Sequence, residues 1–155
     1  MNIRTGILVF FLSLIFFGCL KPPDYSVVPA LTFKSLNKSS FHEPTIVDTL
    51  SVDTLKITFS FKDGDGDLGL DQSSTDYDCF LTDSRFPSVP PINYRIPDIT
   101  PQSNVKAISG EIIINIPGVY RRFGFPTDTL SYFIQIKDRA GNMSNKIKTD
   151  RFSVI

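Results

Sequence analysis

The chain of 155 residues contains no tryptophan, a single histidine and only two cysteines. The histidine, His42, lies beside Glu43 in a polar segment, and the sequence offers no motif from which a catalytic triad could be assembled around it. No segment shows the apolar repeat of an amphipathic helix. These absences argue against histidine-based catalysis and against a helical fold, and the lack of tryptophan removes the most usual platform for stacking sugars.

Neither sign of charge is in excess, because 16 lysine and arginine residues balance 16 aspartate and glutamate residues. A protein that binds nucleic acid or an anionic lipid surface through bulk electrostatics carries a strong positive excess. The composition therefore predicts neither nucleic acid nor a charged lipid surface as a bulk partner.

The N-terminus has the layout of a secretory signal. A charged start, Met1 to Arg4, leads into the apolar run Ile7 to Phe17 and then to Gly18 and Cys19. An apolar run of this length is too short to cross the roughly 30 Å hydrocarbon core as a helix, and a small residue before the cysteine is typical of a cleavage site. We expect residues 1–18 to be removed, leaving Cys19 as the first residue. The simpler alternative is an ordinary signal peptide that happens to end at a cysteine.

This segment resembles the lipobox of bacterial lipoproteins, in which the cysteine, here Cys19, carries the lipid that attaches the protein to a membrane. Phe16 stands where leucine is most common, a departure tolerated in Bacteroidetes lipoproteins. Residues 19–29 are polar and contain prolines, as a tether does. By the same resemblance, Leu20 in place of aspartate implies sorting to the outer membrane. The resemblance also implies that export to the cell surface needs several acidic residues after the cysteine, so the single one in Lys21 to Asp24 favours the periplasmic face.

After this tether we expect one domain, residues 30–155, built from about seven strands. Apolar and polar residues alternate most clearly from Leu55 to Lys62, and similar patterns recur later in the chain. The other predicted strands are 31–36, 77–82, 105–109, 112–116, 130–137 and 146–154. Short strands separated by Gly, Pro, Asn and Asp favour an all-β fold, a single antiparallel sandwich of immunoglobulin-like type, with barrels and jelly rolls as alternatives.

Two further features constrain this domain. The segment 84–102 contains five prolines and cannot form an interior strand, so it is an excursion over one face or an edge segment. If Cys19 carries lipid, Cys79 has no disulfide partner, and its apolar neighbours predict a buried, unreactive thiol.

The strand 55–62 runs directly into Asp63-Gly-Asp65-Gly-Asp67. Three carboxylates at alternate positions, with glycines between them, can surround one hard cation, and oxygen-rich sites of this kind suit calcium. An EF-hand is not expected, because Leu68 stands where that loop needs glycine and Ser74 where it needs glutamate. The remaining calcium ligands must therefore come from elsewhere in the fold.

The source we predict is the loop from Asp138 to Asn142, which follows the strand 130–137. In an immunoglobulin-like sandwich the loops after the second and sixth strands emerge at the same end. We therefore predict a structural calcium site formed by Asp63, Asp65, Asp67, Asp138 and Asn142. The alternative is that both segments are ordinary solvated turns.

Four segments together resemble Bacteroidetes outer-membrane lipoproteins that carry an immunoglobulin-like domain: 22–29, 61–70, 94–97 and 138–145. The resemblance covers most of the mature chain, although each motif is short. It implies a cell-envelope protein and brings no catalytic residues with it.

A second candidate site is the segment Gly118 to Pro126, where Tyr120, Arg121, Arg122 and Phe123 combine aromatic rings with two arginines. Such residues are enriched at binding hot spots. The alternative arrangement packs the aromatic rings under the loop and leaves the arginines in solvent, and this is the arrangement we expect.

These observations predict a non-catalytic, lipid-anchored envelope protein that serves as an accessory or scaffolding subunit of an outer-membrane protein complex. The alternative is a glycan-binding module that uses Tyr94, Tyr120 and Phe123 in place of tryptophan. An enzyme is a third reading, and it would require a deep polar pocket at residues that the sequence does not identify.

Overall fold

The computed structural model describes residues 23–44, 53–101 and 106–155. The predicted signal peptide, Cys19 and the first residues of the tether lie outside this part of the chain. Within it the secondary structure consists of strands without a helix, so the prediction of an all-β fold is confirmed. The described residues accordingly include no helix that is long and apolar enough to cross a membrane.

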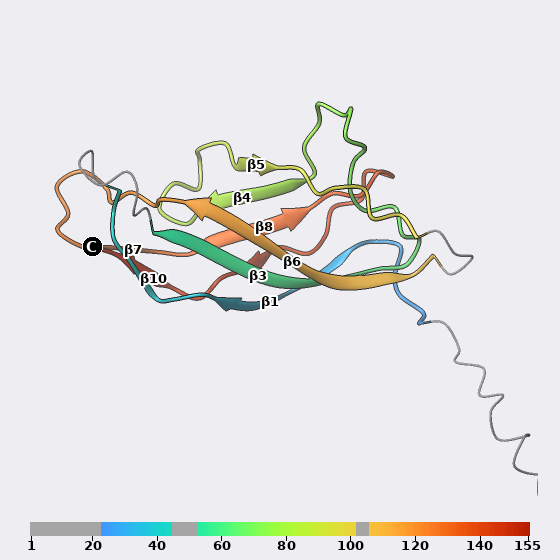
Figure 1. The fold of residues 1–155 in the computed structure, drawn as a ribbon, viewed down its shortest axis with the longest axis horizontal. Helices are drawn as coiled ribbons and strands as arrows, with labels where there is room; N and C mark the ends of the chain where they lie inside the picture. The colour runs from blue at the N-terminus through green and yellow to red at the C-terminus, as the bar shows by residue number, and fades with distance from the viewer. Residues whose placement is uncertain (1–22, 45–52, 102–105) are drawn as a thin grey trace, which may run out of the picture.

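The described residues form ten strands: β1 (Ala30–Leu36), β2 (Ser40–Phe41), β3 (Thr54–Asp63), β4 (Cys79–Asp83), β5 (Ile92–Tyr94), β6 (Ile108–Pro117), β7 (Asp128–Leu130), β8 (Tyr132–Ile136), β9 (Ile147–Lys148) and β10 (Phe152–Val154). They form sheets in the orders β1-β3-β6, β5-β4-β8-β9 and β2-β10-β7 (Figure 1). All pairs are antiparallel except β2 with β10. These open sheets are consistent with a β-sandwich.

Several predicted strand boundaries differ from the observed ones. The window 130–137 spans the end of β7 and all of β8, which lie in different sheets. Residues 108–109 of the window 105–109 continue into the window 112–116 as one strand, β6, because Gly110 continues the ladder opposite Phe61. The window 146–154 is divided between β9 and β10, which lie in different sheets. Among residues 84–101, the described part of the proline-rich segment, the only strand is the three-residue β5 at the edge of its sheet, so the prediction that this segment forms no interior strand is confirmed.

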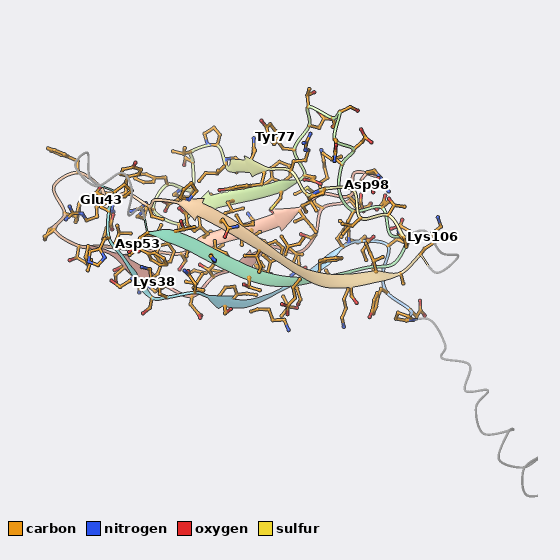
Figure 2. All side chains as sticks on the ribbon, viewed as in Figure 1. Lys38, Glu43, Asp53, Tyr77, Asp98 and Lys106 are labelled. Atoms are coloured by element: carbon orange, nitrogen blue, oxygen red, sulfur yellow. The ribbon has the colours of Figure 1, made fainter. Side chains whose placement is uncertain are left out.

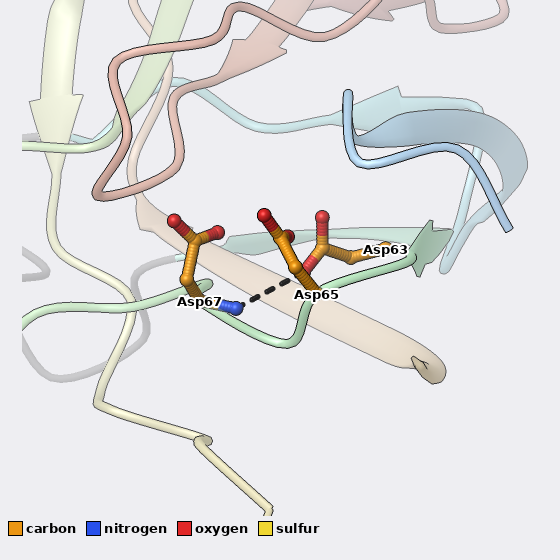
Figure 3. A group of neighbouring side chains, drawn as sticks. All are labelled: Asp63, Asp65 and Asp67. Atoms are coloured by element: carbon orange, nitrogen blue, oxygen red, sulfur yellow. Dashed lines mark hydrogen bonds between the residues drawn. The ribbon is translucent and has the colours of Figure 1, made fainter. Parts of the chain in front are cut away.

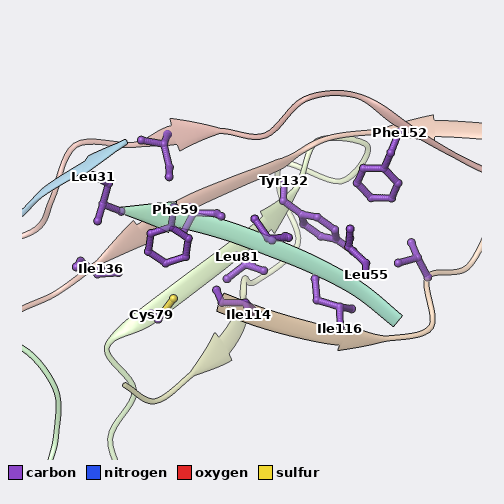
Figure 4. Close-up of a cluster of buried hydrophobic side chains, with 14 of the residues drawn as sticks. Leu31, Leu55, Phe59, Cys79, Leu81, Ile114, Ile116, Tyr132, Ile136 and Phe152 are labelled. Atoms are coloured by element: carbon purple, nitrogen blue, oxygen red, sulfur yellow. The ribbon is translucent and has the colours of Figure 1, made fainter. Parts of the chain in front are cut away.

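The core lies between the sheets and is organised by the alternation of β3. Leu55, Ile57 and Phe59 are fully buried, and they pack with inward residues of β4, β6 and β8 (Figure 4). Burying one such side chain contributes roughly 1.5–3 kcal/mol. Cys79 is buried in this cluster, as predicted, and burial raises the pKa of its thiol to about 12.

The two ends of the molecule's long axis differ. Residues 23–29, the described part of the predicted tether, lie at one end, close to the turn that follows β3 (Figure 1). Asp98 and Lys106 lie at this same N-terminal end, whereas Glu43 lies at the opposite end (Figure 2). Residues 118–126, which we name the aromatic loop, are at the opposite end too, because Arg121 bonds to Glu43.

Candidate metal centre

The inward face of β3 continues beyond its apolar residues. Every second residue from Leu55 points into the core, and the fifth such position is Asp63, the last residue of the strand. Its side chain is 0% exposed. The same alternation that builds the core therefore carries a carboxylate into a buried position at the N-terminal end of the molecule.

We name residues 63–67 the Asp loop. Its residues after Asp63 turn back over this carboxylate. One oxygen, Asp63 Oδ2, accepts a hydrogen bond from the backbone N–H of Gly66 at 2.8 Å. The same oxygen accepts one from the backbone N–H of Asp67 at 3.2 Å (Figure 3). This turn brings one carboxylate oxygen from each of Asp63, Asp65 and Asp67 within 4.8 Å of one another. The three predicted ligands of the Asp loop thus form a single group.

Each of these three carboxylates has an oxygen without a partner. Asp63 Oδ1, Asp65 Oδ1 and Asp67 Oδ1 are buried and accept no hydrogen bond within the described part of the chain. No ion pair among the described residues involves any of the three. A buried carboxylate oxygen without a partner is costly, and three such oxygens facing one another add repulsion. A bound cation would offset both the cost of burying these oxygens and the repulsion between them.

Burial and the repulsion between neighbouring carboxylates also raise the proton affinity of Asp63 and Asp67. Burial, and next the neighbouring charge of Asp65, raises the pKa of Asp63 to about 6. Burial also raises the pKa of Asp67, with the charges of Asp138 and Asp65 adding to the effect. The Asp loop is therefore a site where negative charge is disfavoured in the absence of a cation.

The loop from Asp138 to Asn142 lies against the Asp loop. The backbone N–H of Arg139 donates to the Asp67 carbonyl at 3.2 Å, and that of Ala140 donates to Asp67 Oδ2 at 3.0 Å. Asp138 is buried because it continues the inward face of β8, two residues after Ile136.

The other two predicted ligands, Asp138 and Asn142, bond to each other in this structure. Asp138 accepts hydrogen bonds from both the backbone N–H and the side-chain amide of Asn142, at 2.7 Å and 2.8 Å. Asp138 lies outside the group of three carboxylates, although its charge helps to raise the pKa of Asp67. The second loop therefore reaches the Asp loop through its backbone, while its two polar side chains hold that loop in shape.

Glycine allows other segments to approach the Asp loop closely. A Cβ atom on Gly64 would lie 2.3 Å from the carbonyl oxygen of Tyr25, in the described tether. A Cβ atom on Gly66 would lie 2.3 Å from the carbonyl oxygen of Lys106. The ammonium of Lys62 also lies 5.3 Å from the centre of the Tyr25 ring. The Asp loop is thus the point where the tether and the segment beyond residue 101 meet the domain.

The donor set favours a hard cation. Three carboxylates without histidine or cysteine provide only oxygen, which suits calcium better than zinc or copper. Calcium takes six to eight oxygen ligands, so the three aspartates would need backbone carbonyls or water to complete the shell. These residues fit calcium as a structural ion.

The aromatic loop at the opposite end differs from what we expected. Tyr120 and Phe125 are about half exposed and Phe123 is fully exposed, whereas both arginines are engaged. Arg121 Nε bonds to Glu43 at 2.8 Å and Arg122 Nη2 to Asp128 at 2.9 Å. The expected packing of the rings under the loop is therefore wrong, because the arginines, and not the rings, fix this loop to the domain.

A buried ion-pair network that the sequence did not indicate supports this loop. Asp128, the first residue of β7, is buried and binds the guanidinium groups of both Arg122 and Arg85. Arg85 also pairs with Asp83 and donates to the Tyr120 carbonyl at 2.9 Å. The hydrogen bonds from Arg122 and Arg85 lower the pKa of Asp128 well below its usual range.

Comparisons of the chain with protein-family models, with curated proteins and with solved structures found no match.

Proposed function

We propose that this protein is a non-catalytic, lipid-anchored subunit of the cell envelope that attaches by one end and contacts a protein partner with the other. The observation that supports this most directly is the contrast between the two ends of the long axis. One end receives the tether, and the opposite end exposes aromatic side chains on a loop fixed by ion pairs (Figures 1 and 2).

At the attachment end, Cys19 would carry the lipid, four residues before the described tether begins. Two or three acyl chains are enough for stable membrane attachment, since each buried methylene contributes about 0.8 kcal/mol. A tether this short keeps the N-terminal end of the domain near the membrane. The opposite end then points away from the membrane toward other envelope components.

Calcium bound at the Asp loop would stabilise the attachment end of the domain. The loop contacts the tether at Tyr25, the segment at Lys106, and the backbone of Arg139 and Ala140. Neutralising Asp63, Asp65 and Asp67 would strengthen the point where these segments meet. Extracellular calcium modules bind at roughly 10⁻⁴ to 10⁻³ M, so the role is structural and not one of signalling.

At the far end, the aromatic loop has the features of a contact surface. Phe123 projects fully into solvent, and the Arg122 guanidinium lies 4.5 Å from the centre of the Phe125 ring. Exposed aromatic rings on a loop that is already ordered bind with little loss of conformational entropy. Such a surface fits a protein partner in the same membrane, where confinement raises the effective concentration.

We further propose the finer assignments made from the sequence: an immunoglobulin-like sandwich, membership of the Bacteroidetes outer-membrane lipoproteins, and a position on the periplasmic face. Support comes from the all-β fold of open sheets and from the approach of the Asp138 to Asn142 loop to the Asp loop. That approach is what an immunoglobulin-like order of strands requires.

Two experiments in the native bacterium test the proposal. Changing Cys19→Ser is expected to remove lipid, detected by mass spectrometry of the N-terminal peptide, and to release the protein from the membrane fraction. A photo-crosslinking amino acid at position 123 is expected to give one dominant adduct with a membrane protein. The same amino acid at position 77, an exposed aromatic outside the loop, serves as the control. Identical adducts at both positions would contradict the proposed contact surface.

A glycan-binding role is favoured by one observation, the exposure of Tyr120 and Phe123 on the aromatic loop. Tyr94, the third ring considered, is only partly exposed and belongs to β5. A glycan array probed with the purified protein distinguishes the two functions. Saturable binding that is lost on Tyr120→Ala would favour the glycan-binding role.

A further inference from the structure

The two largest sheets do not match in width. The sheet β1-β3-β6 has three strands and the sheet β5-β4-β8-β9 has four. The sheets align along one side, where β1 contacts β9. On the other side, β6 ends the three-stranded sheet while β5 extends the four-stranded sheet by one more strand. The position beside β6 and over β5 therefore lacks a strand in the described part of the fold.

A groove occupies this position. It has a volume of about 680 Å³ and runs between residues 108–115 of β6 and the segment 94–99. Its lining is mostly apolar and includes Phe61, Cys79, Tyr94 and Ile96. Ile108 and Ile112, on the inward face of β6, are only partly buried, whereas Ile114 and Ile116 on the same face are buried. The apolar face of β6 is thus incompletely covered along the groove.

The edge of β6 is long and unprotected. All ten of its residues pair with β3 in continuous register. Among the described residues, none from 108 to 117 forms a backbone hydrogen bond with any strand or loop other than β3. Natural edge strands are usually short or interrupted by bulges, lysine or proline. The other outer edges follow this rule: β1 contains a bulge, β5 has three residues after two prolines, and β9 has two residues.

The opposite wall of the groove is fixed before anything binds. The buried carboxylate of Asp78 accepts a hydrogen bond from the backbone N–H of Ile96 at 2.7 Å. The carbonyl of Ile96 accepts one from the N–H of Leu70 at 2.9 Å. An occupant therefore meets a preformed site and does not have to order this wall.

We propose that the groove is the acceptor site for an extended segment of a partner protein, which adds to β6 as the missing strand. The inference depends on the proposed role as a subunit of an envelope complex, and it adds a second contact surface, separate from the aromatic loop, through which a partner binds. A strand of about seven or eight residues matches the groove along 108–115, and its main-chain groups would pair with the free edge of β6. Alternate side chains would be apolar, because they would cover Ile112, Tyr94 and Ile96.

Charge and shape specify the occupant further. Glu111 is exposed on the outer face of β6 and has no ion pair among the described residues, so a basic residue fits on the outer face of the added strand. A second copy of this chain fits poorly. Two copies paired through β6 would form one continuous sheet, and the overhanging β5 of each copy would then lie on the same side and compete for the same space.

The probe for the test is a fluorescent eight-residue peptide, Thr-Ile-Lys-Ile-Thr-Ile-Thr-Ile, added to the mature lipidated protein in mild detergent. We expect saturable binding and slower hydrogen exchange of backbone amides in 108–115. A matched peptide with N-methyl groups on alternate amides keeps the side chains and loses one hydrogen-bonding edge. It should bind at least tenfold more weakly.

Two variants of β6 complete the test. Ile112→Lys, which puts a charge into the groove, should weaken peptide binding at least tenfold, whereas Ile113→Lys on the opposite face of the same strand should leave it within threefold. Ile113 is 57% exposed, so its replacement is a matched control. If Ile112→Lys fails to fold, the N-methylated peptide still tests whether the main chain of the peptide pairs with β6.

The proposal is overturned if the peptide does not bind saturably, if the N-methylated peptide binds equally well, or if exchange slows outside the groove. It is also overturned if the protein alone forms dimers that Ile113→Lys preserves and Ile112→Lys abolishes. Because this assay contains no other envelope component, its failure would leave the proposed membrane complex untouched. Absence of that complex would likewise not alter peptide binding.

Discussion

Replacing the buried carboxylate of the Asp loop, Asp63→Asn, is expected to stabilise the calcium-free protein and to abolish its stabilisation by calcium. In the folded protein the pKa of Asp63 is raised from 3.8 to about 6, chiefly by burial. A raised pKa means that the stability contributed by the protonated group is complete below the unfolded pKa and is lost as the pH rises through about 6. The calcium-free protein should therefore lose stability between about pH 4 and pH 7.

The size of this loss of stability follows from the shift in the pKa of Asp63. A displacement of about two pKa units corresponds to about 3 kcal/mol, which the calcium-free wild type loses at pH 7.5 and the asparagine variant does not. The asparagine oxygen can still accept from Gly66 and Asp67, so the turn is retained. For the wild type, 10 mM calcium restores about 2.7 kcal/mol if Kd is about 10⁻⁴ M.

Urea unfolding at pH 7.5 measures the free energy of unfolding of the wild type and of Asp63→Asn, each in chelator and in 10 mM calcium. In chelator the variant should be more stable than the wild type by up to about 3 kcal/mol, and only the wild type should gain from calcium. Asp76→Asn, the same change at an exposed position, should follow the wild type. A variant that is less stable than the wild type in chelator, or an equal calcium response in both, would refute this reasoning.

Calcium affinity measured by titration calorimetry should fall about tenfold per pH unit below pH 6, because Asp63 must release its proton before it can bind the ion. Gly66→Ala, with a Cβ 2.3 Å from a carbonyl oxygen and φ of +68°, should lose at least about 2 kcal/mol of unfolding free energy. Gly141→Ala, with φ of +92° and open space, should lose only about 1 kcal/mol. Asp128→Ala should cost about 1–3 kcal/mol and make the aromatic loop sensitive to protease, because Arg85 and Arg122 lose the carboxylate they share, although Arg85 keeps Asp83 and Arg122 is partly exposed. Phe123→Ala should leave the melting temperature unchanged, since the ring is fully exposed, and a shift of more than a few degrees would show that the ring is packed.

The alternation of β3 made much of the fold predictable. Period two from Leu55 gives the buried face, and counting two residues beyond Phe61 reaches Asp63, so its burial was already present in the pattern. The same count from Ile134 and Ile136 leads to Asp138. A carboxylate that continues an apolar alternation is thus a signal of a buried site that sequence reasoning can use.

Other features have no local signal. Arg85 and Asp128 are 43 positions apart, and nothing near either residue indicates that they pair. For this reason the sequence could not show that the arginines of the aromatic loop are engaged and that the rings face solvent. The width of the two sheets also depends on which strands pair, and so the groove beside β6 became visible only in the structure.

The most direct test of the proposed function is isolation of the tagged native protein from outer membranes in mild detergent, comparing wild type, Phe123→Ala and Tyr77→Ala. Each preparation is made with and without a calcium chelator, and the components are quantified by mass spectrometry. The account predicts one stoichiometric membrane partner with the wild type and with Tyr77→Ala, and its loss with Phe123→Ala. Recovery of the wild-type protein alone, or equal recovery of a partner with all three proteins, would contradict it.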